Sequence, residues 1–155
     1  MLYPTHAAGG MAAGLMMTNG NFGVTETLII TLTAGIAGLL PDLDSPGSYV
    51  GSWVPAFHSL VAGAVGIVLA TTGFKVLGLS HNGILLNAFL AGYFSHLFLD
   101  ALTPEGVPLL WPLKVKIGLP LVKTGGMIEK LVVFPALFGW VLLQLYSTFG
   151  GGLLL

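Results

Sequence analysis

Two pairs of side chains in this sequence have spacings that suit the ligands of a metal ion. His96 and Asp100 are four residues apart, so on a helix both project from one face, one turn apart. Asp42 and Asp44 are separated by one residue, and alternate residues of an extended chain face the same way. The first pair has an alternative explanation, a hydrogen bond that only satisfies two polar groups in lipid. The second pair has one too, a solvated loop.

Two further histidines, His6 and His58, occur near the starts of apolar segments. Neither indicates a ligand by itself, because a single histidine near an interface usually has no such role. Together with the two pairs they complete a set of three histidines and three aspartates, a mixture that suits Zn²⁺ and also Mn²⁺. The sequence has no Cys, so a metal ion here must be bound by histidine and carboxylate.

The composition indicates that these polar residues lie in a membrane protein. Only 7% of the residues are charged and 55% are hydrophobic, with a mean hydropathy of +0.93, whereas a soluble domain carries roughly a quarter charged residues. The charges leave four stretches without Asp, Glu, Lys or Arg, each long enough for the ~20 residues that cross a bilayer core; these are 1–25, 45–74, 76–99 and 131–155. Five scattered Lys and a net charge of -1 exclude binding of nucleic acid through its phosphates.

The apolar segments predict an all-α, polytopic integral membrane protein of about five helices, some of them short or re-entrant, in a single domain over residues 1–155. The first helix is short for a full span, and Gly10 and Gly14 have the small-xxx-small spacing that lets helices approach closely in lipid. Pro41 is expected to end the second helix, before a polar loop. The segment 103–130, rich in Pro and Lys, is expected to be interfacial or re-entrant. The expected helices are 5–18, 24–40, 56–72, 84–102 and 131–146, and the other loops are 41–55 and 73–83, the latter containing Lys75.

Five crossings place all six candidate ligands in one layer, at the ends of their helices. Four of the five Lys fall on that side and only Lys75 on the other, so the positive-inside rule assigns the site to the cytoplasmic face. By the same argument, His81 and Glu26 fall on the opposite side and do not belong to the site. The layer therefore predicts a dinuclear centre, or one bound ion, near one membrane face.

Glu129 precedes the last helix and falls in the same layer. Three roles are open for it: a seventh ligand, a general base, or an exposed partner of Lys130. Asp44 is the other candidate for the general base, because a carboxylate in such a site can accept the proton of the attacking water.

At these residues the chain resembles the YdjM-like family, which is described as LexA-controlled, inner-membrane, metal-dependent hydrolases. The resemblance covers residues 1 to about 145 and is most specific in 92–112. It implies a bacterial inner-membrane location and a His and Asp pattern similar to that of zinc phospholipase C and P1-type nucleases. The family often has a basic residue before its His-Ser pair, where this chain has none, and Lys114, Lys116 or Lys123 can replace it. The matching segments are 5–6 (TH), 40–46 (LPDLDSP), 57–60 (FHSL), 92–100 (GYFSHLFLD) and 102–107 (LTPEGV). The positions that match the family's ligands are His6, Asp42, Asp44, His58, His96 and Asp100.

The function expected from residues and resemblance together is hydrolysis of a phosphoester, such as that of a membrane lipid, assisted by one or two Zn²⁺ or Mn²⁺ ions. The alternatives are a divalent-cation transporter or channel and a non-catalytic scaffold with a structural metal. Ligands at one edge favour an enzyme over transport, because transport sites tend to lie near the bilayer midplane. The expected partners are membrane lipid and the substrate; Gly- and Ala-rich helix faces also permit a homo-oligomer.

Overall fold

The computed structural model describes residues 1–18, 21–44, 57–78, 82–113 and 115–150, except for the side chains of Asp44 and Asn82. The described residues form helices and turns, with a single isolated bridge between Val107 and Ile117. This confirms the predicted all-α fold. The α-helices are α1 (Tyr3–Thr18), α2 (Val24–Ala37), α3 (Leu60–Val76), α4 (Asn82–Ala101) and α5 (Phe134–Gly150); the short helices are the 3₁₀-helix η1 (Leu40–Asp44) and the π-helix η2 (Glu129–Val133).

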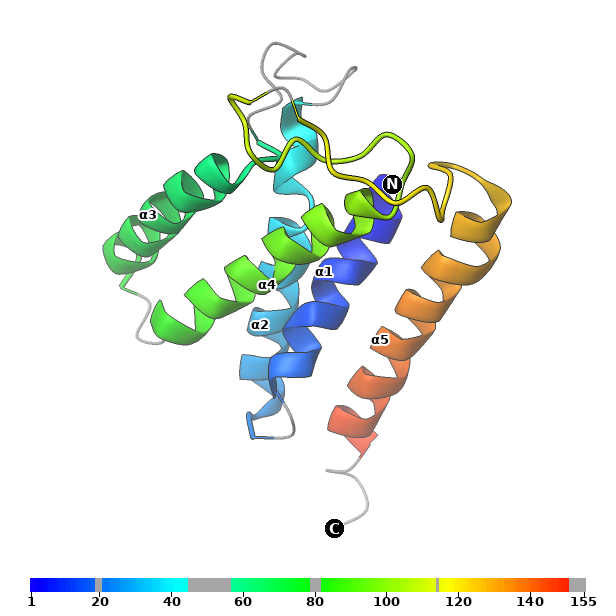
Figure 1. The fold of residues 1–155 in the computed structure, drawn as a ribbon. Coiled ribbons are helices and arrows are strands. Elements are labelled where there is room, and N and C mark those ends of the chain that lie inside the picture. The colour runs from blue at the N-terminus through cyan, green and yellow to red at the C-terminus, as the bar shows by residue number, and fades with distance from the viewer. Residues whose placement is uncertain (19–20, 45–56, 79–81, 114, 151–155) are drawn as a thin grey trace.

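The first helix lies at the centre of the bundle. It packs against α2, α4 and α5, while α3 packs against α4 at the periphery. Figure 1 shows α3 and α5 at opposite edges of the bundle, with the N-terminus and the segment that follows α4 at one end of it. At this end α1 and α3 begin and α2 and α4 finish, as expected for helices that alternate in direction.

Small residues allow three helices to meet at Ala34 of α2. A Cβ added to Gly92 of α4 would lie 2.0 Å from the carbonyl oxygen of Ala34, and one added to Gly10 of α1 would lie 2.4 Å from the same atom. A Cβ on Gly14 would lie 2.7 Å from the Cβ of Ala34. The spacing of Gly10 and Gly14 thus serves close helix packing, as the sequence predicts.

We expect Gly92→Ala to destabilise the protein, because the new methyl group meets backbone and not a flexible side chain. Overpacking of this kind costs about 1–3 kcal/mol of unfolding free energy. The matched control is Gly139→Ala in α5, where an added Cβ meets nothing within 4 Å. Thermal unfolding in detergent should give a lower midpoint for Gly92→Ala than for Gly139→Ala. Equal midpoints would contradict the close contact at Ala34.

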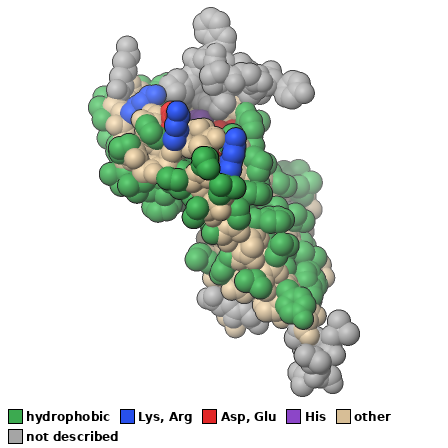
Figure 2. Space-filling view, turned by 90° about the vertical axis from the view of Figure 1, so that its right-hand side faces the viewer, with side chains coloured by type: hydrophobic (Ala, Val, Ile, Leu, Met, Phe, Trp, Pro, Cys, Tyr) green, Lys and Arg blue, Asp and Glu red, His purple; other side chains and the backbone are tan. Residues whose placement is uncertain are grey.

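The outside of the bundle is apolar. Among the described residues, Ile36, Leu69 and Leu143 are 62%, 66% and 69% exposed, and Figure 2 shows hydrophobic side chains over most of one face, with Lys side chains gathered at one end. Three helical stretches are long and apolar enough to cross a membrane: Val24–Leu43, Gly83–Ala101 and Glu129–Gly150. The helices α1 and α3 have 16 and 17 residues, so α1 is short, as predicted.

The third helix differs from its predicted bounds of 56–72. It begins at Leu60 because Ser59 caps it, with the Ser59 hydroxyl accepting a hydrogen bond of 3.2 Å from the backbone N–H of Ala62. It continues to Val76, so the expectation that Lys75 lies in a loop is wrong. A lysine in the last turn is stabilised by the helix dipole.

The segment that carries the aspartate pair also differs from its prediction. Pro41 does not begin an extended loop, because its fixed φ angle suits the first turn of a helix, and residues 40–44 form η1. The expectation of an extended, non-helical segment directly after Pro41 is therefore wrong.

Candidate metal centre

Five of the predicted ligands meet at the end of the bundle where α1 begins. We call His6, Asp42, His58, His96 and Asp100 the His/Asp cluster. Four of these residues each offer one ligand atom, and these atoms lie within 4.8 Å of one another; they are His6, Asp42, His96 and Asp100. This group can hold a metal ion.

Asp100, in the last turn of α4, lies at the centre of the cluster. Its Oδ1 is 3.1 Å from Nε2 of His6. Its Oδ2 is 3.2 Å from Nε2 of His96, one helical turn earlier, and 3.6 Å from Nε2 of His58. The terminal amine of Met1 also contacts Oδ1. One carboxylate thus faces all three histidines of the cluster.

Asp42, in η1, faces the same three rings from the α2 side. Its Oδ1 lies 3.8 Å from Nε2 of His96 and 3.9 Å from Nε2 of His58, and its Oδ2 lies 4.0 Å from Nε2 of His6. The three Nε2 atoms are therefore directed into the space that the two carboxylates border.

The rings of His6 and His96 are buried without good hydrogen bonds at Nε2. Both residues have 0% exposure, and their rings stack with centroids 3.7 Å apart. Neither Nε2 has a partner of good hydrogen-bond geometry in the part of the chain that the structure describes, although oxygens of Asp100 lie close by. A metal ion binds histidine through an unprotonated ring nitrogen, and a bound ion would give each of these two Nε2 atoms a partner.

The second nitrogen of His96 is held by the backbone. Its Nδ1 lies 2.7 Å from the carbonyl oxygen of Gly38, just after α2. Metal-bound histidines usually donate their other ring N–H to a carbonyl or a carboxylate, which fixes the tautomer. This contact turns Nε2 of His96 toward the two aspartates.

These residues fit a zinc ion. Ligand atoms in a tetrahedral zinc site lie about 2.0–2.2 Å from the metal, and therefore roughly 3.3 Å from one another. The N–O distances of 3.1–4.0 Å in the cluster bracket that value. Binding would also give partners to the buried Nε2 atoms, which otherwise cost about 1–3 kcal/mol each.

His58 lies at the rim of the cluster, in the turn before α3. Its side chain is 14% exposed, and its ring meets that of His96 edge-on, with centroids 5.1 Å apart. The hydroxyl of Tyr93, on α4, holds this turn by donating to the carbonyl oxygens of Phe57 and Ser59 at 2.8 and 2.6 Å. His58 is therefore the ring of the cluster that is most open to its surroundings.

Glu129 is buried outside the cluster. Its side chain has 0% exposure, so the expectation of an exposed partner for Lys130 is wrong. Its Oε1 accepts a hydrogen bond of 2.6 Å from the backbone N–H of Leu2, and its Oε2 accepts one of 2.6 Å from that of Gly125. The carbonyl of Leu2 in turn accepts from the N–H groups of Thr5 and His6. Glu129 thus fixes the chain that leads to His6.

Three predicted residues lie wholly or partly outside what the structure describes. The backbone of Asp44 belongs to η1, but its side chain is not described, and His81 and Lys114 are not described at all. Two contributions were missed at the sequence level. The sequence does not indicate that the carbonyl of Gly38 contacts His96, because every residue has a carbonyl. The role of Tyr93 could have been suspected, because it lies three residues before His96 on the same helix.

Known proteins resemble this chain over most of its length. It matches the family described as YdjM inner membrane protein over residues 1–152. It is 38% identical over 128 residues to the Inner membrane protein YdjM of Escherichia coli (strain K12), and equally to that of Shigella flexneri, over 72% of this chain and 64% of each relative. It is 25% identical over 138 residues to the Uncharacterized protein YvsG of Bacillus subtilis (strain 168), over 83% of this chain and 85% of that protein.

No solved structure matches the chain. The aligned part covers just under two thirds of the YdjM proteins of E. coli and Shigella. The match to the family nevertheless extends through all five helices, and three of the helical stretches are apolar enough to span a bilayer. The chain therefore belongs to the YdjM family and is an inner membrane protein.

Proposed function

We propose that this protein is a metal-dependent hydrolase that cleaves a phosphoester at the membrane surface. The observation that carries the proposal is the convergence of three Nε2 atoms and two carboxylates on one point, with the Nε2 atoms of His6 and His96 buried and poorly hydrogen-bonded. A buried polar group without a partner needs an explanation, and a bound ion is one.

We further propose that one or two Zn²⁺ ions, or Mn²⁺ ions, bind there. The group of four can hold one ion. His58 faces both carboxylates from the rim and is the candidate ligand of a second ion. When bound, a divalent ion would supply Lewis acidity and lower the pKa of water toward neutrality.

The residues around the cluster would assist the remaining steps of phosphoester hydrolysis. The oxygen of the attacking water forms the new bond to phosphorus, the bond from phosphorus to the alcohol oxygen breaks, and that oxygen takes up a proton. Asp44 is the proposed acceptor of the water's proton. Glu129 is the weaker candidate for this role, because both its oxygens already accept backbone hydrogen bonds.

Charge and position support an enzyme at the cytoplasmic face. Lys116, Lys123 and Lys130 are exposed in the part of the chain between α4 and α5, at the end of the bundle that carries the cluster, while Lys75 lies at the far end of α3. This asymmetry follows the positive-inside rule. A cluster at the helix ends also argues against a transport site, which would lie nearer the midplane.

The test is metal analysis of the detergent-purified protein beside the double variant Asp42→Ala, His96→Ala. We expect roughly one or two equivalents of zinc or manganese per wild-type chain, as a mononuclear or dinuclear site requires, and none in the variant. The metal-loaded wild type should hydrolyse a phosphodiester probe, and the variant should not.

Two outcomes would overturn the proposal. Absence of metal from the wild type, after reconstitution with several divalent ions, would exclude metal-dependent hydrolysis. A closed shell of four protein ligands around zinc, without turnover of any phosphoester, would indicate a structural metal, because catalytic sites keep one position open.

A further inference from the structure

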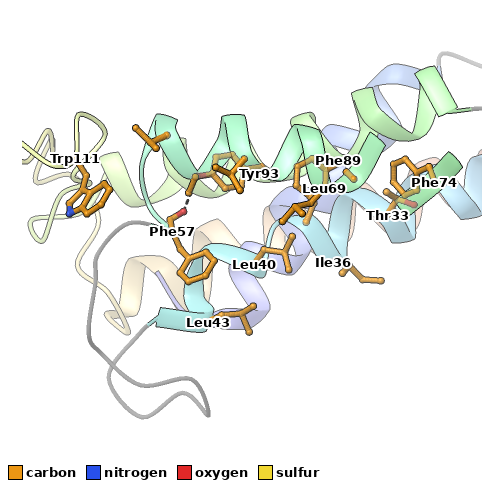
Figure 3. A pocket seen from close by; sticks show the side chains of 16 residues that line it. Thr33, Ile36, Leu40, Leu43, Phe57, Leu69, Phe74, Phe89, Tyr93 and Trp111 are labelled. Atoms are coloured by element: carbon orange, nitrogen blue, oxygen red, sulfur yellow. Dashed lines mark hydrogen bonds between the residues drawn. The ribbon is translucent and has the colours of Figure 1, made fainter. Parts of the chain in front are cut away.

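A long apolar groove runs between α2, α3 and α4. It has a volume of about 690 Å³, within the ~300–1,000 Å³ of typical small-molecule sites. Figure 3 shows Phe57 and Trp111 at one end of the groove, Thr33 and Phe74 at the other, and Leu69 and Phe89 between them. The groove exists because α3 packs on α4 and leaves a space beside α2.

The lining of the groove selects an apolar occupant. Of its 16 lining residues, only Thr33, Tyr93 and Trp111 carry a polar side-chain atom. The hydroxyl of Tyr93 already donates to the carbonyls that flank His58. A polar ligand along the groove would lose its hydrogen bonds to water without replacing them, at a cost of several kcal/mol for each group.

One end of the groove adjoins the His/Asp cluster. Its lining residues Leu40 and Leu43 flank Asp42 in η1, and its lining residue Phe57 directly precedes His58. Tyr93 lies one helical turn before His96. A molecule that fills the groove therefore has one end beside the proposed catalytic residues.

The side of the groove is continuous with the lipid-facing surface. Two of its walls belong to the candidate spans Val24–Leu43 and Gly83–Ala101. The rim residues Ile36, Val65 and Leu69 are 62%, 53% and 66% exposed. In a bilayer this surface faces hydrocarbon, so an acyl chain can enter sideways without crossing water.

The charges near the cluster complement a phosphate group. Lys116, Lys123 and Lys130 are exposed in the part of the chain between α4 and α5, which Figure 1 shows at that end of the bundle, whereas the groove itself carries no charged residue. A molecule with an apolar tail and an anionic phosphate head matches both surfaces at once.

We propose that the groove binds one acyl chain of an anionic membrane phospholipid and so presents its phosphoester to the His/Asp cluster. This inference rests on the proposed function and names its class of substrate. Because bilayer hydrocarbon is as apolar as the groove, the chain gains little from the hydrophobic effect. The groove therefore orients the acyl chain, and the phosphate head group contributes most of the binding free energy of the phospholipid.

The experiment compares two substitutions of the same kind in α3. Ala70 lines the distal half of the groove, whereas Ala64 is exposed on the same helix and does not line it. Native mass spectrometry of the full chain in detergent would measure retained phosphatidylglycerol with 16-carbon chains and, separately, with 8-carbon chains. We expect Ala70→Phe to weaken retention of the long-chain lipid by about tenfold or more, since overpacking a filled site forces its contents to shift.

Three further results are expected. Ala70→Phe should retain the short-chain lipid as the wild type does, Ala64→Phe should retain both lipids, and both variants should keep the metal content of the wild type. Equal loss or equal retention of the long-chain lipid in the two variants would overturn the groove assignment. So would a dimer that Ala70→Phe dissociates, since the groove would then hold a second copy of the chain. Selective loss in Ala70→Phe without any turnover by the metal-loaded wild type would refute the proposed function and support the groove.

Discussion

Replacement of Asp100 by Asn is expected to abolish metal retention while leaving the fold intact. Asp100 faces Nε2 of His6, His58 and His96 at 3.1, 3.6 and 3.2 Å, so of the two carboxylates it lies nearer to each of the three rings than Asp42 does. Asparagine has nearly the same shape but no negative charge. Changing a residue that only contacts a metal ligand lowers metal affinity by about 10–100-fold. Because Asp100 is itself a proposed ligand, we expect a larger loss of metal affinity.

Thermal unfolding gives a readout of this loss that does not depend on activity. A ligand at 100 times its Kd stabilises the folded state by about 2.7 kcal/mol, so added zinc should raise the midpoint of the wild type and leave that of Asp100→Asn unchanged. Without metal the variant should unfold at a lower temperature than the wild type, because the buried terminal amine of Met1 loses its carboxylate partner.

Glu26→Gln is the matched control for the loss of a carboxylate charge. Glu26 lies at the start of α2, at the other end of the bundle, where its Oε2 accepts a hydrogen bond of 3.1 Å from the backbone N–H of Gly23. We expect this variant to bind metal like the wild type. A zinc-dependent rise in midpoint that persists in Asp100→Asn, or disappears in Glu26→Gln, would show that the ion binds elsewhere.

The sequence was sufficient to predict that five of the six candidate residues meet at one end of the bundle, because this prediction needed only the order and direction of the helices. His6 lies in the first turns of one helix, Asp42 follows the end of the next, and His96 and Asp100 lie in the last turns of the fourth. Antiparallel helices bring such positions to one end whatever their exact bounds. The shift of α3 from 56–72 to Leu60–Val76 moved His58 into a turn without removing it from the cluster.

Details that depend on backbone conformation could not be predicted in this way. Whether the residues after Pro41 are extended or helical could not be predicted, because proline is compatible with both continuations. The carbonyl of Gly38 orients His96, and every residue carries a carbonyl. The position of the groove depends on which helix α3 packs against, and a uniformly apolar helix such as α3 does not encode its partner in its periodicity.

The surroundings of Glu129 could not be predicted from the sequence either, because its neighbours include residues from the opposite end of the chain. A carboxylate before an apolar helix is usually solvated, yet this one is buried and accepts backbone hydrogen bonds from Leu2 and Gly125, each of 2.6 Å. Position 2 is 127 residues away in the sequence. Nothing local in the sequence distinguishes this carboxylate from an exposed partner of Lys130.

We expect Glu129→Gln to weaken metal binding by about 10–100-fold, as changes to groups that orient metal ligands do. Glutamine presents an N–H₂ group to one of the two backbone donors, so one hydrogen bond is lost and a buried N–H remains without a partner, at a cost of about 1–3 kcal/mol. The carbonyl of Leu2 accepts from the N–H of His6 at 3.1 Å. Loosening Leu2 should therefore displace His6 from the cluster. Competition with a chelator measures the affinity, and thermal unfolding measures the stability.

Glu105→Gln is the control for this substitution. Glu105 is exposed, and hydrogen bonds from its own backbone N–H and from the hydroxyl of Thr124 hold the pKa of its carboxyl below the usual value. The control thus neutralises a carboxylate that is fully charged at neutral pH, and we expect it to change neither metal affinity nor stability. If Glu129 were instead the general base, Glu129→Gln would lose hydrolysis while retaining metal affinity. That result would reject the positioning role. In that role Glu129 acts on His6 through Leu2, so its replacement lowers turnover by displacing His6, and this displacement would lower metal affinity as well.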